Sequence, residues 1–97
     1  MDVVYSLQGV EFEWDENKAR INIRDHHVTF EEAAEVFFDP FYQTGDASDD
    51  EEPREFIIGY TFSQRLLLAV YTERGDRPRI ISARPVTPAE RRLYEEA

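Results

Sequence analysis

The sequence predicts an α+β domain: an antiparallel sheet of four or five strands, with two helices from the first half of the chain and one from its end packed on it. Three observations predict this class. Residues 10–14 and 54–62 alternate between apolar and polar, two capping-box patterns begin helices, and residues 66–71 form an apolar run of strand length. The 97 residues suit a single domain, 1–97, with a modest core.

The N-terminal residues predict a strand. Residues 1–9 suit either an extra edge strand or a tail. In the segment that follows, Val10, Phe12 and Trp14 recur at every second position, which is typical of a half-buried strand. A tryptophan can also stack on a nucleic-acid base, but the place of Trp14 in the alternation favours the core.

A helix is predicted directly after this strand. Asp15 suits its N-cap, and the helix is expected to continue through Asp25. Ala19 and Ile23 are four residues apart, so they share one side of the helix. We expect these two side chains to face the core.

A second helix begins at the capping box of residues 29–32, Thr-Phe-Glu-Glu. It is expected to end at Asp39-Pro40, because a residue that precedes proline leaves the α region. Its apolar residues recur at the spacing of a core-facing helix: Phe30, Ala33, Ala34, Phe37 and Phe38.

The rest of the chain predicts strands joined by short turns. Residues 41–44 suit a short strand, residues 45–53 form a loop with five acidic side chains, and residues 54–62 form the alternating strand. A tight turn at residues 63–64 leads into a hairpin made by residues 66–84. A second capping box, at residues 87–90, begins the last helix with proline at its first position.

Charge is unevenly distributed along the chain. The formal net charge is −10, but residues 65–97 carry 7 basic and 5 acidic side chains, against 4 basic and 16 acidic ones in residues 1–64. An acidic surface repels nucleic acid, so any such contact must be local and come from the second half. There is no cysteine, which excludes disulfides and thiolate metal sites. No run approaches the ~20 apolar residues of a membrane span and no signal-peptide pattern begins the chain, so a cytoplasmic location is expected.

The predicted hairpin contains five arginines against two acidic residues: Arg65, Arg74, Arg77, Arg79 and Arg84. Two interpretations stay open. The guanidinium groups either converge on one electropositive hollow that binds phosphate, or pair with carboxylates such as those of the acidic loop. Arg79 and Arg84 differ by an odd number, so an ideal strand sends them to opposite faces. A bulge, or the strand end, must bring them together if both act at one site.

Several short motifs keep a common order and spacing from about residue 11 to residue 96. They are Phe12-Glu13-Trp14-Asp15-Glu16-Asn17-Lys18-Ala19, Asn22, His26, Val28-Thr29-Phe30-Glu31-Glu32-Ala33, Asp39-Pro40, Ile58-Gly59, Val70-Tyr71-Thr72-Glu73-Arg74-Gly75, Arg79-Ile80-Ile81-Ser82-Ala83-Arg84, Glu90-Arg91 and Tyr94-Glu95. This ordered set resembles the BrnT toxin family.

The resemblance implies a RelE-like fold and a ribonuclease toxin of a bacterial type II toxin–antitoxin pair. The implied partners are an RNA substrate and a small DNA-binding antitoxin, BrnA, so that DNA is contacted only through the antitoxin. Such nucleases need no metal or other cofactor. The ribose 2′-hydroxyl attacks the neighbouring phosphate, and the protein supplies proton transfer and charge stabilisation.

The resemblance and the residue chemistry together select five catalytic candidates: Lys18, His26, Arg65, Arg79 and Arg84. The arginines would neutralise charge on the phosphate. His26 is either a general acid or base, or a positive group at a helix C-terminus, and Lys18 either transfers a proton or is a surface lysine. The expected RNA-binding residues are Trp14, Arg74 and Arg77, and no residue is expected to bind a metal.

Two departures from the family pattern bear on activity. Asp25-His26-His27 stands where the family usually reads Lys-His-Gly, and Gln64 stands where a glycine commonly precedes the hairpin arginine. The first departure exchanges a positive charge for a negative one beside the expected RNA surface. The alternative function is therefore a degenerate toxin that acts as an antitoxin-binding or protein-interaction module and no longer cuts RNA.

Overall fold

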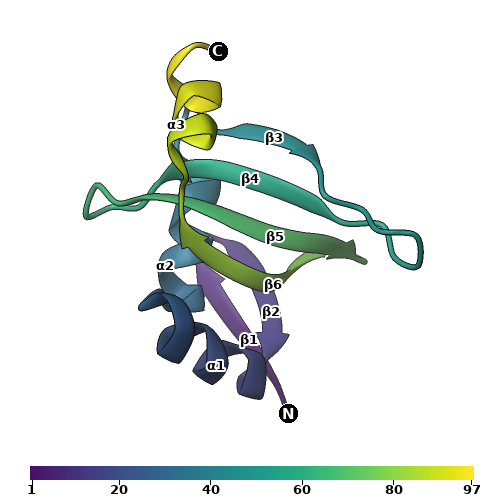
Figure 1. Cartoon of the computed structure of the whole chain (residues 1–97). Helices are drawn as coiled ribbons and strands as arrows, with labels where there is room; N and C mark the ends of the chain where they lie inside the picture. Colours follow the sequence, from purple (N-terminus) through teal and green to yellow (C-terminus); the bar gives the residue numbers. More distant parts are fainter.

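The computed structural model describes all 97 residues and contains one six-stranded sheet with helices on both faces (Figure 1). The strand order is β1-β2-β6-β5-β4-β3. The elements in chain order are β1 (Asp2–Leu7), β2 (Val10–Asp15), α1 (Glu16–His26), α2 (Phe30–Glu35), the short 3-10 helix η1 (Val36–Phe38), β3 (Gln43–Asp46), β4 (Glu55–Tyr60), β5 (Leu66–Arg74), β6 (Arg77–Pro85) and α3 (Pro88–Glu95).

The sheet is mixed, so the prediction of four or five antiparallel strands is wrong in detail. Of residues 1–9, which were predicted as an extra edge strand or a tail, Asp2–Leu7 form the edge strand β1, which pairs antiparallel with β2 across a turn at Gln8-Gly9. β2 then pairs with β6 in parallel, through Glu13 and Arg79. A tight turn joins only antiparallel strands, whereas β2 is followed by α1 and α2, which allow a parallel neighbour.

The helix starts are confirmed. The Asp15 side chain accepts a hydrogen bond from the Lys18 backbone N–H at 3.0 Å, and both predicted capping boxes are present, at Thr29 and at Thr87. Each side-chain oxygen satisfies a backbone N–H that has no partner inside its helix. None of the three helices is long and apolar enough to cross a membrane.

The buried side of α1 agrees with the prediction only in part: Ala19 packs against the core as expected, but Ile23 does not. Ile23 is 45% exposed, whereas the buried residue of α1 is Asn22. Its side-chain amide donates to the Ala83 carbonyl at 2.8 Å and to the Val28 carbonyl at 3.0 Å, and its oxygen accepts from the Ala83 N–H at 3.1 Å. Asn22 thus replaces a strand partner for Ala83 of β6 and fixes α1 against that strand.

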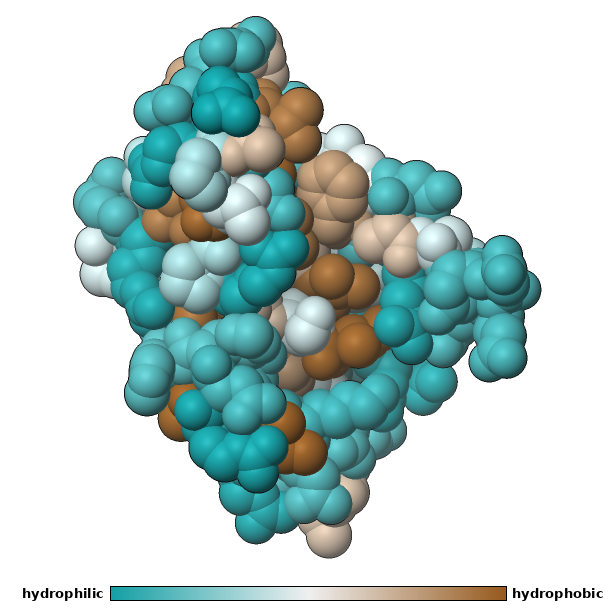
Figure 2. All heavy atoms as spheres, in the orientation of Figure 1, coloured by the Kyte–Doolittle hydropathy of each residue, from teal (hydrophilic) through white to brown (hydrophobic).

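The main core lies between the sheet and α2, and contains Phe12, Trp14, Phe30 and Ile80. A smaller core on the other face combines Ile58, Leu66 and Leu68 with partly buried residues: Phe56, Tyr60, Val70, Val86 and Tyr94. Figure 1 shows α2 and α3 on opposite sides of the sheet. On the face that α3 partly covers, apolar side chains gather in a hollow with a hydrophilic rim (Figure 2).

A bulge in β6 decides which arginines share a face. Val70 pairs with Ser82 but Tyr71 pairs with Ile80, so Ile81 is the extra residue. Ile80 and Ala83 are consequently both buried in the main core although they are three residues apart. The residues that flank them, Arg79 and Arg84, therefore face the opposite side together, as the hypothesis of a shared site required.

The Thr61–Arg65 turn also needs an unusual backbone. Gln64, which stands where the family commonly has glycine, has a φ of 70°. The turn is closed by hydrogen bonds from the Thr61 N–H to the Arg65 carbonyl at 2.9 Å and from the Gln64 N–H to the Thr61 carbonyl at 3.0 Å. A turn is therefore present at the predicted place, but residues 62–64 form it in place of the predicted two-residue turn at 63–64, with a strained residue in the position that favours glycine.

Candidate functional site

The hairpin arginines do not converge on one hollow, so that prediction is wrong. Arg79 and Arg84 share a face but lie near opposite ends of β6, and Arg65 lies on the other face against α2. Each of the five hairpin arginines has a carboxylate within ion-pair distance. The alternative interpretation, ion pairing, therefore describes all five in the free protein, with partners from β1, β2, α2 and α3 in place of the acidic loop.

Three of these arginines surround one nearly buried carboxylate, an arrangement that we call the Glu13 cluster. It comprises Arg74, Arg77 and Arg79 with Asp2, Glu11 and Glu13. The two oxygens of Glu13, which is 7% exposed, lie 2.6 Å from Nη1 of Arg79, 3.7 Å from Nη1 of Arg74 and 4.0 Å from Nη1 of Arg77. Three positive and three negative groups cancel, so the cluster carries no formal net charge.

Arg79 is the most completely bound arginine of the cluster. Its Nη1 and Nη2 donate to the two carboxylate oxygens of Asp2 at 3.1 and 3.0 Å, while Nη1 also donates to Glu13 at 2.6 Å. The hydrogen bonds that Arg79 donates to Asp2 and, to a lesser extent, to Glu13 raise the pKa of its guanidinium, and the contact with Arg79 lowers the pKa of Asp2. The fork of two parallel hydrogen bonds is also how arginine holds phosphate.

Arg84 forms a second, separate pair with Glu90 of α3. Its Nη1 and Nη2 donate to the two oxygens of Glu90 at 2.7 and 2.9 Å. The hydrogen bonds from Arg84, helped by the Thr87 N–H of the capping box, lower the pKa of Glu90 to about 2. Arg84 therefore ties the end of β6 to the start of α3.

Arg65 forms a third pair, on the helix side of the sheet. Its Nη1 donates to Glu32 at 2.8 Å and to the His27 carbonyl at 3.2 Å. Burial acts to raise the pKa of Glu32, but the hydrogen bonds from Thr29 and Arg65 outweigh it and leave that pKa below its ordinary value. Arg65 thus reaches the C-terminal end of α1, one residue beyond His26.

Lys18 and His26 lie together in a hollow of about 280 Å³ between α1 and β6, which we call the α1–β6 groove. Its lining is Lys18, Ile21, Asn22, Asp25, His26, Ile81 and Ser82. Neither the Lys18 nor the His26 side chain has a hydrogen bond or an ion pair within the protein. Both side chains are exposed, and unlike the arginines they have no carboxylate partner.

The spacing along α1 explains how the groove forms. Lys18, Asn22 and His26 follow one another at intervals of four residues, so they lie on one side of the helix. Asn22 binds Ala83 of β6 and thereby holds the two bases on either side of it against the strand. This four-residue spacing is the signal in the sequence that could have identified Asn22 and the groove.

Arg79 and Arg84 flank the two residues of β6 that line the groove, Ile81 and Ser82. Arg84 follows Ser82 by two residues, and alternate residues of a strand lie about 7 Å apart on one face. Arg79 lies on the far side of the bulge, toward the Glu13 cluster. The groove and its neighbourhood therefore combine two unpaired bases with one arginine that is held by Glu90.

Two residues at the end of α1 differ from the usual family pattern, Asp25 and His27, and neighbouring groups on the same helix stabilise both. His27, where the family usually has glycine, has a φ of 57° and its N–H donates to the Ile23 carbonyl, which ends the helix. Asp25 pairs with Arg24 at 2.9 Å, and this hydrogen bond lowers the pKa of Asp25. The negative charge at the groove thus has a positive neighbour on the same helix.

Trp14 is not available to bind RNA, and that prediction is wrong. It is 2% exposed and packs edge-on against Phe30 at a centroid distance of 5.7 Å. Its place in the strand alternation had favoured the core, and the structure confirms that alternative. Of the predicted RNA-binding residues, only Arg74 and Arg77 lie at the surface, both in the Glu13 cluster.

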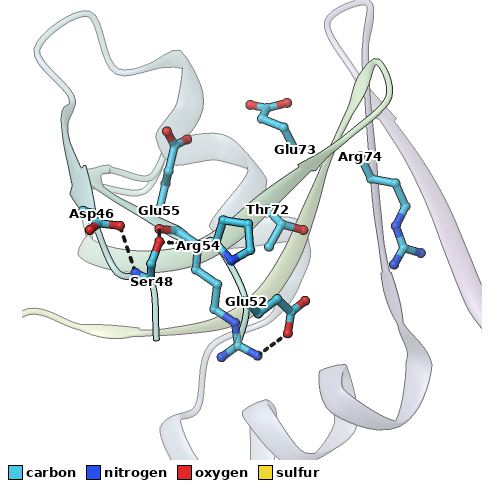
Figure 3. Close-up of a pocket in the computed structure, with 9 residues that line it drawn as sticks. Asp46, Ser48, Glu52, Arg54, Glu55, Thr72, Glu73 and Arg74 are labelled. Carbon is cyan, nitrogen blue, oxygen red and sulfur yellow. Dashed lines mark hydrogen bonds and ion pairs between the residues drawn. The ribbon is translucent and has the colours of Figure 1, made fainter. Parts of the chain in front are cut away.

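A larger hollow, of about 520 Å³, lies at the ends of β4 and β5 and does not suit an anion. In Figure 3 the side chains of Arg54, Glu52 and Arg74 point to one side of the strands and those of Glu55 and Glu73 to the other. Four acidic and two basic side chains line it, so its formal charge is negative. No group of three or more histidine, aspartate or glutamate side chains is placed to hold a metal ion.

The chain resembles proteins of one kind. A protein-family model described as "Ribonuclease toxin, BrnT, of type II toxin-antitoxin system" matches residues 14–90, so β1 lies outside the matched range. The crystal structure of the Brucella abortus ribonuclease toxin, BrnT, has a similar fold, with a TM-score of 0.61 and 21% identity over 76% of this chain and 92% of that chain. A search of curated proteins found no match.

Proposed function

Because this chain belongs to the BrnT family of ribonuclease toxins of type II toxin–antitoxin systems, we propose that it cleaves RNA and that the α1–β6 groove is its reacting centre. The observation that carries the proposal is that Lys18 and His26 line the same hollow. They are two bases from one helix, unbound within the protein and lining the same hollow.

The proposed chemistry needs no metal. The ribose 2′-hydroxyl gives up its proton and attacks the adjacent phosphorus, while the 5′-oxygen of the next nucleotide takes up a proton and leaves. A histidine changes charge between about pH 5 and pH 8 and therefore suits one of these transfers. Lys18 either stabilises the negative charge of the phosphate or carries out the second proton transfer. Ser82 of β6 offers a hydroxyl at the same hollow.

The arginines bind phosphates in this proposal, after exchanging a carboxylate for the substrate. Arg84 is the arginine for the scissile phosphate, because it follows Ser82 on the same strand and its guanidinium fork matches two phosphate oxygens. Arg79, with Arg74 and Arg77, binds the RNA backbone further along the sheet face. Arg65 acts from the end of α1, where it holds the His27 carbonyl.

The proposed regulator is an antitoxin of the BrnA kind. Membership of a type II system implies an antitoxin protein as partner, and DNA would be contacted only through it. The strongly acidic first half of the chain supports a partner with basic segments, since opposite charges accelerate and orient association.

Cleavage of RNA by the purified protein in EDTA tests the proposed activity. We expect wild type to cut, and the Lys18→Met, His26→Gln double variant to lose nearly all activity. Arg91→Gln removes an exposed, unpaired positive charge on α3 and is the matched control for charge. Equal cleavage by wild type and the double variant would show that the activity lies elsewhere or comes from a contaminant.

A second function is favoured by the ion pairs of the hairpin: a toxin-like interaction module that binds an antitoxin but does not cut. All five arginines are bound to carboxylates in the free protein. Expression of the chain alone in a bacterium separates the two functions. Growth arrest that an antitoxin relieves supports the nuclease, whereas unimpeded growth together with antitoxin binding supports the module.

A further inference from the structure

The N-terminal strand β1 adds one carboxylate to the Glu13 cluster, and its position resembles that of a bound phosphate. Asp2 presents both oxygens to Nη1 and Nη2 of Arg79, at 3.1 and 3.0 Å. Arginine grips two oxygens of a phosphodiester through the same two parallel hydrogen bonds. We propose that Asp2 occupies a backbone-phosphate position of the RNA site and that the substrate displaces it. This inference rests on the proposed function, because it names what regulates RNA access to the same sheet face.

Arg79 does not depend on Asp2 for its position. Glu13 holds Nη1 from the interior at 2.6 Å, and the Glu13 side chain is only 9% exposed, against 51% for Asp2. When Asp2 leaves, Nη2 of Arg79 becomes free while Glu13 keeps the guanidinium in place. The two carboxylates therefore have different roles: Glu13 positions the arginine, and Asp2 covers its outward edge.

Displacement of Asp2 requires little rearrangement. Asp2 is the first residue of an edge strand, and its side chain is half exposed. Its backbone is held in register opposite Asp15, and the Met1 carbonyl accepts a hydrogen bond from the Glu16 N–H at 3.0 Å. Rotation of one side chain uncovers Arg79 and leaves β1 in place.

The net charge of the cluster becomes more positive when Asp2 turns away, which favours binding of RNA. With Asp2 bound, three arginines face three carboxylates. When Asp2 turns away, the remaining groups carry one net positive charge beside the guanidinium that has become free. β1 lies outside residues 14–90, which the family model matches, whereas the three arginines of the cluster lie within them.

Binding of a single-stranded RNA with 2′-O-methyl riboses, which has no 2′-hydroxyl to attack, tests the inference without any cleavage. Fluorescence anisotropy at several salt concentrations gives the affinity and its salt dependence. We expect Asp2→Asn to bind about threefold to fivefold more tightly than wild type, as the loss of one exposed competing ion pair implies. The logarithmic salt slope should stay nearly unchanged, because RNA makes the same phosphate contact with Arg79 in both proteins once Asp2 has been displaced.

Two matched variants separate uncovering of Arg79 from a general change of charge. Asp50→Asn changes the net charge equally, but in the acidic loop, where its side chain has no ion pair. It should leave the affinity nearly unchanged. Arg79→Gln added to Asp2→Asn should abolish the gain, with thermal unfolding to show that the double variant remains folded.

Equal gains for Asp2→Asn and Asp50→Asn, or the absence of RNA binding by both wild type and Asp2→Asn, overturn the inference. Its failure is distinguishable from that of the proposed function. A gain in binding without cleavage by any variant would keep the Asp2 cover and reject the nuclease. Cleavage by wild type with no effect of Asp2→Asn on binding would keep the nuclease and reject the Asp2 cover.

Discussion

The Glu13 cluster and the α1–β6 groove both contain positively charged or basic side chains, but only those of the cluster are paired with carboxylates. In the cluster, three arginines are bound to three carboxylates around one nearly buried glutamate. In the groove, Lys18 and His26 are exposed and have no partner. The difference teaches that basic residue content does not by itself locate a reacting centre. A base that is already bound stabilises the fold, whereas a free base beside a hollow is available for chemistry.

The largest expected effect is on catalysis at the groove. Replacement of Lys18 by Met should lower the rate of RNA cleavage by about 100-fold or more, the usual contribution of a proton-transferring group. The free energy of unfolding should change by less than about 0.5 kcal/mol, because the exposed side chain makes no hydrogen bond or ion pair within the protein. Single-turnover cleavage and urea unfolding measure the two quantities. A loss of stability without a loss of cleavage rate would show that Lys18 has a structural role and no catalytic one.

The next effect belongs to the cluster and is on stability. Glu13→Gln leaves three arginines without their interior counter-charge, and should cost about 2–3 kcal/mol in the free energy of unfolding, since breaking a buried pair from one side is expensive. Urea denaturation measures it. Glu73→Gln, at an exposed carboxylate of β5 without an ion pair, is the control and should change stability by less than about 0.5 kcal/mol.

Asn22 lines the α1–β6 groove but, unlike Lys18 and His26, it is buried and fixes α1 against β6. Asn22→Ala should cost about 2 kcal/mol through the loss of three buried hydrogen bonds to the backbone. Hydrogen exchange at the Ala83 amide should accelerate, since that N–H loses its acceptor. Asn17→Ala, on the exposed side of α1, is the matched control. Unchanged exchange at Ala83 would mean that α1 is held by other contacts.

The smallest effect is the pH dependence of the Arg84–Glu90 pair. Arg84 lowers the pKa of Glu90 from 4.5 to about 2 in the folded protein. A carboxyl with a depressed folded-state pKa stabilises the fold above pH 4.5, and this stabilisation disappears as the pH falls toward 2. We expect a contribution of about 1 kcal/mol, given the partial exposure of both side chains. Glu90→Gln should remove this part of the acid dependence, and Glu95→Gln should retain it.

Local patterns predicted much of the fold. Both capping boxes, the helical spacing from Phe30 to Ala34 and the apolar run of β5 depend on residues close in sequence, and all are present. The parallel pairing of β2 with β6 was missed, because Glu13 and Arg79 are far apart in the chain and no periodicity encodes their contact. The burial of Asn22 was missed because its four-residue spacing from Lys18 and His26 shows only a shared side of the helix, and does not indicate which strand that side contacts.

The candidate site was predicted in part. Lys18 and His26 lie in one groove, and the bulge at Ile81 brings Arg79 and Arg84 to one face. The carboxylates that bind the arginines could not be assigned from composition, because most of them come from segments distant in the chain. The acidic loop was the obvious source of negative charge, but the partners are Asp2, Glu11, Glu13, Glu32 and Glu90.

The rate of RNA cleavage in EDTA, compared between wild type and His26→Gln, tests the groove most directly. If His26 transfers a proton, His26→Gln should cleave about 100-fold more slowly than wild type while remaining folded. Cleavage by His26→Gln at the wild-type rate would contradict the assignment of the reacting centre to the α1–β6 groove.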